Sequence, residues 1–194
     1  NPDMVTTLMD PFALSPGFRG PEQPHGAKPL YEDLLGSWSA PFVMATINTK
    51  NIHRSNMLMG HSYGEDFVYD EMMLTGPGDA GEAAAKAVAA DKSMANDTTA
   101  PGEGPSREER ENGFYDVLFI GGDGSGPGLR VGVKGDMDPG YGSTSKMMAE
   151  SAVCLLLNPD LASGGVWTPA AAMGMALVER LEANAGLSFA QEES

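Results

Sequence analysis

The chain has 194 residues, of which 41% are hydrophobic, which is enough for an ordinary globular domain with an apolar core. Its 27 acidic residues against 12 basic ones give a formal net charge of −15, which excludes a general affinity for nucleic acid. Three histidines and one cysteine, Cys154, provide neither an intrachain disulfide nor a Cys/His zinc site. We therefore expect an intracellular protein of a reducing compartment, cytoplasmic or lipid-associated, with Cys154 in its core and no bound metal.

Residues 1–30 are expected to form a linker or loop. The stretch 11–30 is rich in proline and glycine, which exclude a helix or a central strand. Residues 1–10 read as the end of a segment that continues from upstream sequence, and the chain has no apolar run near the ~20 residues needed to cross a bilayer. The remaining residues, 31–194, are expected to form the folded domain.

Three elements are predicted before residue 92. A serine at 37 or 39 followed by Pro41 favours a helix start, so we predict a helix over about Ala40–His53. Aromatic and aliphatic residues alternate loosely over Glu65–Leu74, which favours a strand. The alanine-rich stretch Gly81–Asp91 has strong helix propensity but few side chains to bury, which predicts a short, weakly docked helix.

The clearest pattern in the second half is a pair of strands. Residues 92–112 are polar and rich in turn formers, which predicts a mobile loop before this pair. Phe114–Ile120 and Leu129–Lys134 are expected to pair, with the aliphatic side chains of the second strand facing the core. Because the glycine-rich run Gly121–Gly128 leads into a second strand, we interpret it as a hairpin loop and not as a dinucleotide-binding turn.

Two helices and a short strand are predicted to follow. The first helix begins at Ser143 or Thr144 and ends near Leu157; the second begins after Thr168 and ends at Gly186, ahead of a terminal strand. Strands and helices mix without a regular strand–helix–strand alternation. The predicted fold class is therefore α+β, with a mixed, mostly antiparallel sheet packed by helices.

Five collinear blocks resemble one family. They are WSAPFVMATINTKNIHRSN, YGEDFVYDE, APGEGPSREERENGFYDV, DPGYGSTSKMMAESAVCLLL and GGVWTPAAAMGMALVERL. In this order they are similar to segments of the saccharopine dehydrogenase-like oxidoreductases, in the branch of the trans-acting enoyl reductases. The resemblance implies the C-terminal domain of a two-domain oxidoreductase, which binds substrate and supports self-association, here as a homodimer. It also implies that NAD(P)H is held mainly by an N-terminal Rossmann domain that these residues lack.

The resemblance has one notable departure. Relatives often carry a longer hydrophobic segment at the position of residues 75–100, which are polar here. Burying alanines yields little free energy, so this segment weakens the expectation of a membrane or lipid-surface association. A small, lipid-type substrate remains the expected ligand.

The main candidate site lies at the start of the helix after GYGST. Lys146 could bind a carboxylate, a thioester oxygen or a phosphate, together with the backbone N–H groups of Gly142, Ser143, Thr144 and Ser145. The alternative is that Lys146 pairs with a glutamate one turn later. Tyr141 could donate a proton, or its ring could pack over the core.

Other polar residues are weaker candidates. Asn48 and Arg54 could bind an anionic substrate, although Arg54 could instead satisfy helix carbonyls. Asp136 and Asp138 are interpreted as turn residues, since two carboxylates seldom make a metal site. The histidines at positions 53 and 61 are expected at the surface or at a helix end.

Three functions follow in order of preference. The first is the substrate-binding portion of an NAD(P)H-dependent oxidoreductase that carries out enoyl-type reduction in lipid metabolism, with the fragment inactive alone. The second is a non-catalytic, lipid-associated or scaffold module of the same fold. The third is an amino-acid dehydrogenase of the saccharopine type, which is disfavoured because a carboxylate-rich substrate needs several cations.

Overall fold

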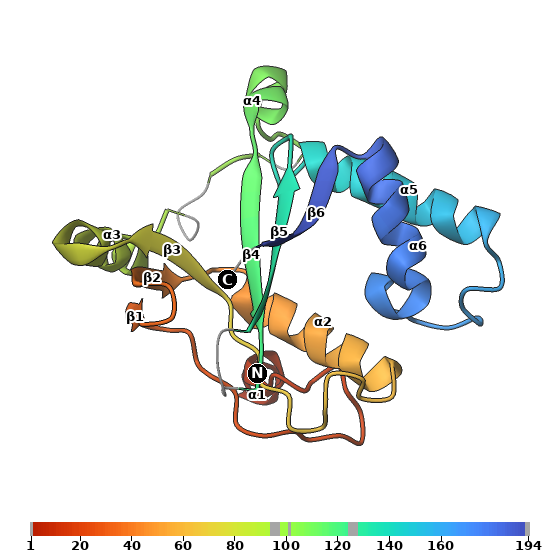
Figure 1. Cartoon of the computed structure of the whole chain (residues 1–194), viewed down its shortest axis with the longest axis horizontal. Helices are drawn as coiled ribbons and strands as arrows, with labels where there is room; N and C mark the ends of the chain where they lie inside the picture. Colours follow the sequence, from red (N-terminus) through yellow and green to blue (C-terminus); the bar gives the residue numbers. More distant parts are fainter. Residues whose placement is uncertain (1, 94–97, 101, 124–127, 193–194) are drawn as a thin grey trace. The chain divides into compact units, whose positions relative to one another are not determined.

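The computed structural model of the chain describes residues 2–93, 98–100, 102–123 and 128–192 (Figure 1). The chain divides into two compact units, Asn1–Asp97 and Thr98–Ser194, and each is described by itself. Each unit contains a three-stranded antiparallel sheet together with helices. The predicted α+β class with antiparallel strands is therefore confirmed.

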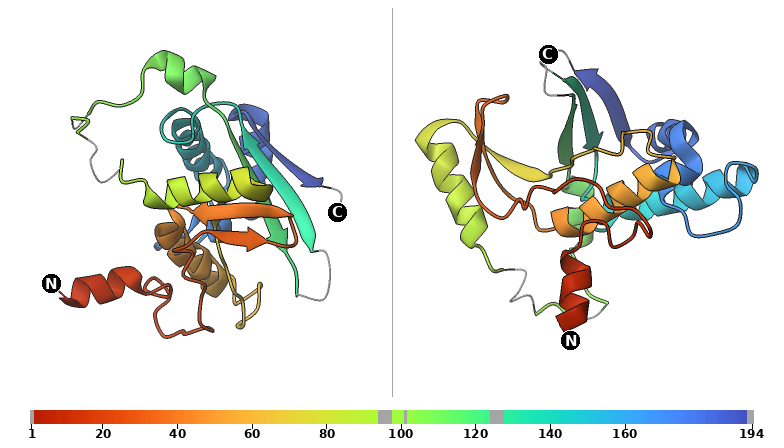
Figure 2. Two further views of the ribbon diagram at one scale, coloured as in Figure 1. Left: turned by 90° about the vertical axis from the view of Figure 1, so that its left-hand side faces the viewer. Right: turned by 90° about the horizontal axis from the view of Figure 1, so that it is seen from below.

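The first unit is built around the sheet β1–β2–β3. In chain order its elements are α1 (Pro2–Met9), β1 (Leu30–Glu32), β2 (Ser37–Pro41), α2 (Ala45–Leu58), β3 (Met72–Gly76) and α3 (Gly78–Ala90). Helix α3 packs across β2 and β3 (Figure 2). Ala40 of β2 and Ala85 of α3 are fully buried, so small side chains allow the helix to approach the sheet closely. The alanine-rich helix is thus longer and better docked than the sequence predicts.

The predicted start of the second helix, at Ala40, is wrong. Ala40 and Pro41 pair with β3 instead, and Ser39 on the same strand donates a hydrogen bond to the carbonyl oxygen of Leu30. Proline is tolerated here because it is the last residue of its strand. Helix α2 begins only at Ala45 and extends to Leu58, without a capping side chain.

The predicted strand Glu65–Leu74 is correct only at its end, in β3. The preceding residues have no ladder partner; instead, the buried amide of Gln23 accepts a hydrogen bond from the N–H of Tyr69 and donates one to the carbonyl oxygen of Phe67. One side chain therefore satisfies backbone groups that a neighbouring strand would otherwise pair. Gln23 belongs to the segment 10–29, which has no helix or strand, as its prolines and glycines predict.

The second unit is built around the sheet β4–β5–β6. Its elements are α4 (Arg107–Asn112), β4 (Tyr115–Gly121), β5 (Leu129–Gly135), α5 (Gly142–Leu157), α6 (Pro169–Asn184) and β6 (Leu187–Glu192). The predicted hairpin is confirmed as the antiparallel pair β4–β5, and the terminal strand is confirmed as β6. The middle of the hairpin loop, 124–127, and part of the predicted mobile loop, 94–97 and 101, lie outside the described residues.

The core of the second unit lies between α5, α6 and β6. Its buried members are Cys154, Ala172, Met173, Leu177, Leu181, Ala185 and Leu187. The expected core position of Cys154 is therefore confirmed, and Met173, Leu177 and Leu181 place one face of α6 in the same core. The inward alternation expected on β5 is only partly correct, since Leu129 is 57% exposed whereas Gly132 is buried.

Backbone geometry shapes both ends of α6. Gly186 has φ +73°, the left-handed conformation expected of a helix-terminating glycine. Thr168 occupies the cap position, but its side chain makes no capping hydrogen bond. Gly174 has φ 48° and ψ −132°, which kinks the helix near its first turn, a feature that the sequence pattern does not indicate. Among the described residues, no helix is long and apolar enough to cross a membrane.

Candidate functional site

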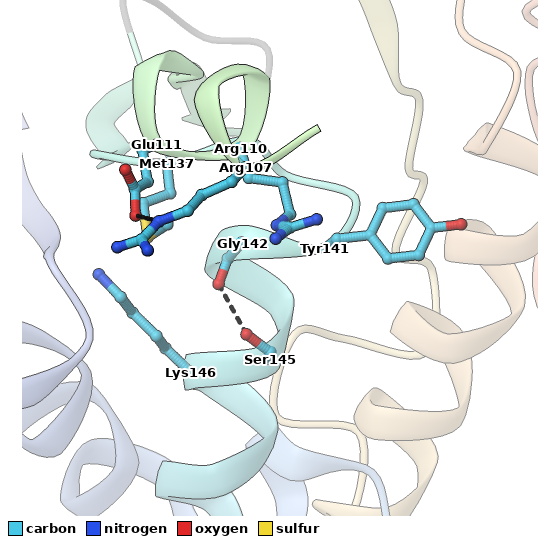
Figure 3. A pocket seen from close by; sticks show the side chains of 8 residues that line it. All are labelled: Arg107, Arg110, Glu111, Met137, Tyr141, Gly142, Ser145 and Lys146. Atoms are coloured by element: carbon cyan, nitrogen blue, oxygen red, sulfur yellow. Dashed lines mark hydrogen bonds and ion pairs between the residues drawn. The ribbon is translucent and has the colours of Figure 1, made fainter. Parts of the chain in front are cut away.

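A shallow cleft of about 400 Å³ lies where α4 approaches the start of α5 (Figure 3). Both elements belong to the second unit. The lining residues are Arg107, Arg110, Glu111, Met137, Tyr141, Gly142, Ser145 and Lys146. The cleft thus contains both candidate catalytic residues, Tyr141 and Lys146, together with two arginines that the sequence reasoning did not select.

Helix α4 is positioned by a capping box. The Ser106 hydroxyl accepts a hydrogen bond from the N–H of Glu109, and the Glu109 carboxylate accepts one from the N–H of Ser106. Residues 107–112 are therefore helical, which corrects the expectation that the loop extends to 112. In this helix Arg107 and Arg110 are three residues apart and share one face.

The start of α5 is occupied by the chain's own Asp138. The Asp138 carboxylate accepts hydrogen bonds from the N–H groups of Gly140, Tyr141 and Gly142 at 3.0, 3.0 and 2.6 Å, and its backbone carbonyl accepts one from Ser143. Desolvation alone would raise the pKa of Asp138, but these hydrogen bonds, with the nearby Arg110 guanidinium, lower it overall. Asp138 therefore stays ionised and caps the helix.

This cap corrects the predicted binding mode at the helix start. The N–H groups of Gly142 and Ser143 are already paired and are not free to bind a ligand. The Ser143 hydroxyl is fully buried and lies 2.8 Å from the Tyr115 hydroxyl, while the Thr144 hydroxyl donates to the carbonyl oxygen of Pro139. Contact of these three residues with substrate stays a prediction, and in the structure they hold the helix start in place.

Lys146 lies on the cleft side of α5. Its Nζ is 3.5 Å from an Asp136 carboxylate oxygen, and its side chain is 37% exposed. The alternative pairing with Glu150 does not occur, because Glu150 forms an ion pair with Arg180 of α6. Lys146 is thus held loosely enough to contact a ligand in the cleft.

Tyr141 is 57% exposed, so its ring does not pack over the core. Figure 3 shows the ring directed away from Lys146, and a Cβ placed at Gly104 would lie 3.2 Å from it. In this arrangement the phenol and the ammonium face different regions of the surface. The two groups would therefore contact different parts of a ligand.

Asn48 and Arg54 lie on α2 in the first unit. The Asn48 amide donates to a Glu71 carboxylate oxygen at 2.9 Å, and the Arg54 guanidinium donates to the carbonyl oxygen of Leu14 at 3.1 Å. Both contacts tie α2 to neighbouring loops of the same unit. A role in binding substrate stays a prediction for both residues.

His53 is buried, contrary to the expected surface position. Only 2% of it is exposed, its Nε2 has no hydrogen-bond partner among the described residues, and its ring contacts those of Phe12 and Phe67. Burial lowers the pKa of this imidazole, so the neutral form is favoured. His53 is a packing residue of the first unit.

The described residues do not provide an evident metal or dinucleotide site. Within them, no three His, Cys, Asp or Glu side chains converge as metal ligands. The glycine-rich run between β4 and β5 joins two antiparallel strands, whereas a dinucleotide fingerprint joins a strand to a helix. The chemistry that the second unit offers is that of a cationic cleft.

Comparison with known proteins points to one group of relatives. The chain is 36% identical over 217 residues to a Mycobacterium tuberculosis (strain H37Rv) protein provisionally named a trans-acting enoyl reductase, covering 97% of this chain and 51% of the relative. It is 34% identical to the trans-acting enoyl reductase of Mycobacterium bovis (strain BCG), covering 93% and 50%, and 31% identical to that of Mycobacterium ulcerans (strain Agy99), with the same coverage. The chain spans about half the length of these curated relatives. No protein family profile and no solved structure matches it.

Proposed function

We propose that these residues form the substrate-binding portion of an NAD(P)H-dependent enoyl reductase of lipid metabolism. The observation that carries the proposal is the similarity over 97% of the chain to a protein provisionally named a trans-acting enoyl reductase. A saccharopine dehydrogenase-like ancestry and a homodimeric state belong to the same proposal and rest on the sequence resemblance. We assign most of the cofactor contacts to the Rossmann domain that the resemblance implies, and leave a minor contribution to the present residues.

The second unit supplies the groups that would orient the substrate. The ammonium of Lys146 lies at the edge of the cleft and would bind a negatively charged group of the substrate or cofactor. Tyr141 stays a candidate proton donor from the outer side of the same turn. The cap by Asp138 fixes the helix start, so Lys146 would be presented in one position without rearrangement of the backbone.

The proposal is tested in two chains. The 194-residue chain alone should show no micromolar NADPH binding by cofactor fluorescence, whereas a chain extended to the length of the relatives should bind NADPH at micromolar concentrations and reduce a fatty enoyl thioester. Micromolar NADPH binding to the short chain would contradict the placement of the cofactor. An extended chain that reduces no enoyl thioester with NADH or NADPH would contradict the activity.

The candidate catalytic residues are tested in the extended chain. Lys146→Ala should lower kcat/KM by roughly tenfold or more, as expected for the loss of one charged hydrogen-bonding group. Tyr141→Phe separates the two readings of Tyr141, because a lost proton donor lowers kcat whereas a lost surface contact changes only KM. Lys134→Ala, which removes an exposed cation of β5, is the matched control and should leave both constants unchanged.

A further inference from the structure

The cleft between α4 and α5 gathers positive charge in a strongly acidic chain. Arg107, Arg110 and Lys146 all line it, against one lining carboxylate, Glu111, although the chain as a whole carries a net charge of −15. Two of these cations come from α4 and one from α5. The excess of cations in the cleft is therefore a local feature, because the charges of the rest of the protein are mostly negative.

Two of the cations face each other. Figure 3 shows the Arg107 guanidinium and the Lys146 ammonium directed toward one another across the cleft. The carboxylate of Glu111 contacts only the Nε side of Arg107, at 2.7 Å, and Asp136 lies 3.5 Å from Lys146. Two cations that face each other repel. An anion bound between them would be attracted to both and would offset this repulsion.

The donors of the cleft are side chains and not the helix start. Asp138 occupies the N–H groups of Gly142 and Ser143, the first two of α5, so an anion in the cleft would be bound by side-chain cations. Arg110 donates to the carbonyl oxygen of Pro105 through Nη1 and interacts electrostatically with the Asp138 carboxylate, and Figure 3 shows its guanidinium directed toward the Tyr141–Gly142 turn, away from Lys146. A guanidinium matches the oxygens of either a carboxylate or a phosphate. Two facing cations favour a phosphate dianion, because it carries more negative charge and more acceptor oxygens than a carboxylate.

From this geometry we infer that the cleft is a phosphate-binding site formed by Arg107 and Lys146, with Arg110 at its rim. The phosphate is carried by the substrate or by a nucleotide cofactor, both of which present the same group. The inference deepens the proposed function, since it rests on that function only for the identity of the molecule that carries the phosphate. Phosphate binding itself requires neither a bound cofactor nor turnover.

The test is a titration of the ¹⁵N-labelled 194-residue chain with inorganic phosphate in low-salt buffer, followed by NMR. Amides of α4 and of the first turns of α5 should shift saturably, and acetate at the same ionic strength should not shift them. Arg107→Gln should weaken binding about tenfold, as expected for the loss of a charged hydrogen-bonding group. Lys134→Gln, which removes the same charge from β5, should change it less than twofold.

Glu111→Gln is a second variant, for which we expect the opposite effect on phosphate affinity. Removal of the lining carboxylate should tighten phosphate binding, a gain that misfolding cannot produce. Equal weakening by Arg107→Gln and Lys134→Gln, or equal saturation by acetate, would overturn the inference. Adenosine 2′-phosphate and phenyl phosphate then separate the two sources, because tighter binding of the nucleotide assigns the group to the cofactor and equal binding assigns it to the substrate.

Discussion

Gly135→Ala is the substitution that most directly tests how the sheet of the second unit supports the cleft. Gly135 of β5 pairs with Tyr115 of β4. A Cβ at position 135 would lie 2.2 Å from two ring carbons of Tyr115 and 2.6 Å from its hydroxyl oxygen, well inside van der Waals contact. The ring must therefore move, and its hydroxyl, now 2.8 Å from the buried Ser143 hydroxyl at the start of α5, would lose that partner.

Two effects determine how much Gly135→Ala lowers the unfolding free energy of the second unit. Overpacking typically destabilises by about 1–3 kcal/mol, and a buried hydroxyl left without a partner by a similar amount, so we expect a loss of about 2–5 kcal/mol in the second unit. Amide hydrogen exchange, measured on peptides from β5 and α5, reports this free energy separately from the first unit. Gly121→Ala at the other end of the same hairpin is the control, because a Cβ there meets nothing within 4 Å. A loss below about 1 kcal/mol for Gly135→Ala would refute the reasoning.

Two further predictions concern the cores. His53 is buried in its neutral form, so its pKa in the folded state is below that in the unfolded state, and the stabilisation is fully present above about pH 6.5 and is lost as the pH falls below it. The unfolding free energy of the first unit should decline by up to about 1.4 kcal/mol per pH unit there, and His53→Leu should remove that slope in urea titrations. Leu181→Ala should destabilise the second unit by about 2–5 kcal/mol in the same exchange experiment, whereas the exposed Met175, replaced by Ala, should change it by less than about 1 kcal/mol.

Local patterns predict the second unit better than the first. Helices α5 and α6 and strand β6 follow from helical spacing and glycine at a helix end, because these elements bury their own apolar faces. The hairpin follows from its β-forming residues and the glycine-rich turn between its strands. In the first unit, by contrast, the buried positions are largely polar or very small, such as Gln23, Ser39 and Asn56. Hydrophobic periodicity carries no signal there, and the pairing of β2 with β3 depends on contacts distant in sequence.

The site could be predicted in part. The position of Lys146 in the first turns of α5 follows from the sequence, but the cap by Asp138 was interpreted only as turn chemistry, and its consequence for the helix N–H groups was missed. The two arginines were missed because residues 92–112 were interpreted as a loop. The signal was present, since a serine at 106 followed three residues later by Glu109 is the capping-box pattern and predicts a helix with Arg107 and Arg110 on one face.

Asp138 caps α5 with the chain's own carboxylate, so the structure of this unit does not depend on which ligand is bound. The negative charge of Asp138 offsets the positive end of the α5 dipole, so the turn 138–142 keeps its backbone geometry whichever molecule enters the cleft. Selectivity then resides in a few long side chains that project from a six-residue helix and can be exchanged without disturbing the sheet behind them. Related sequences could thus accept differently charged ligands on the same scaffold through substitutions in α4 alone.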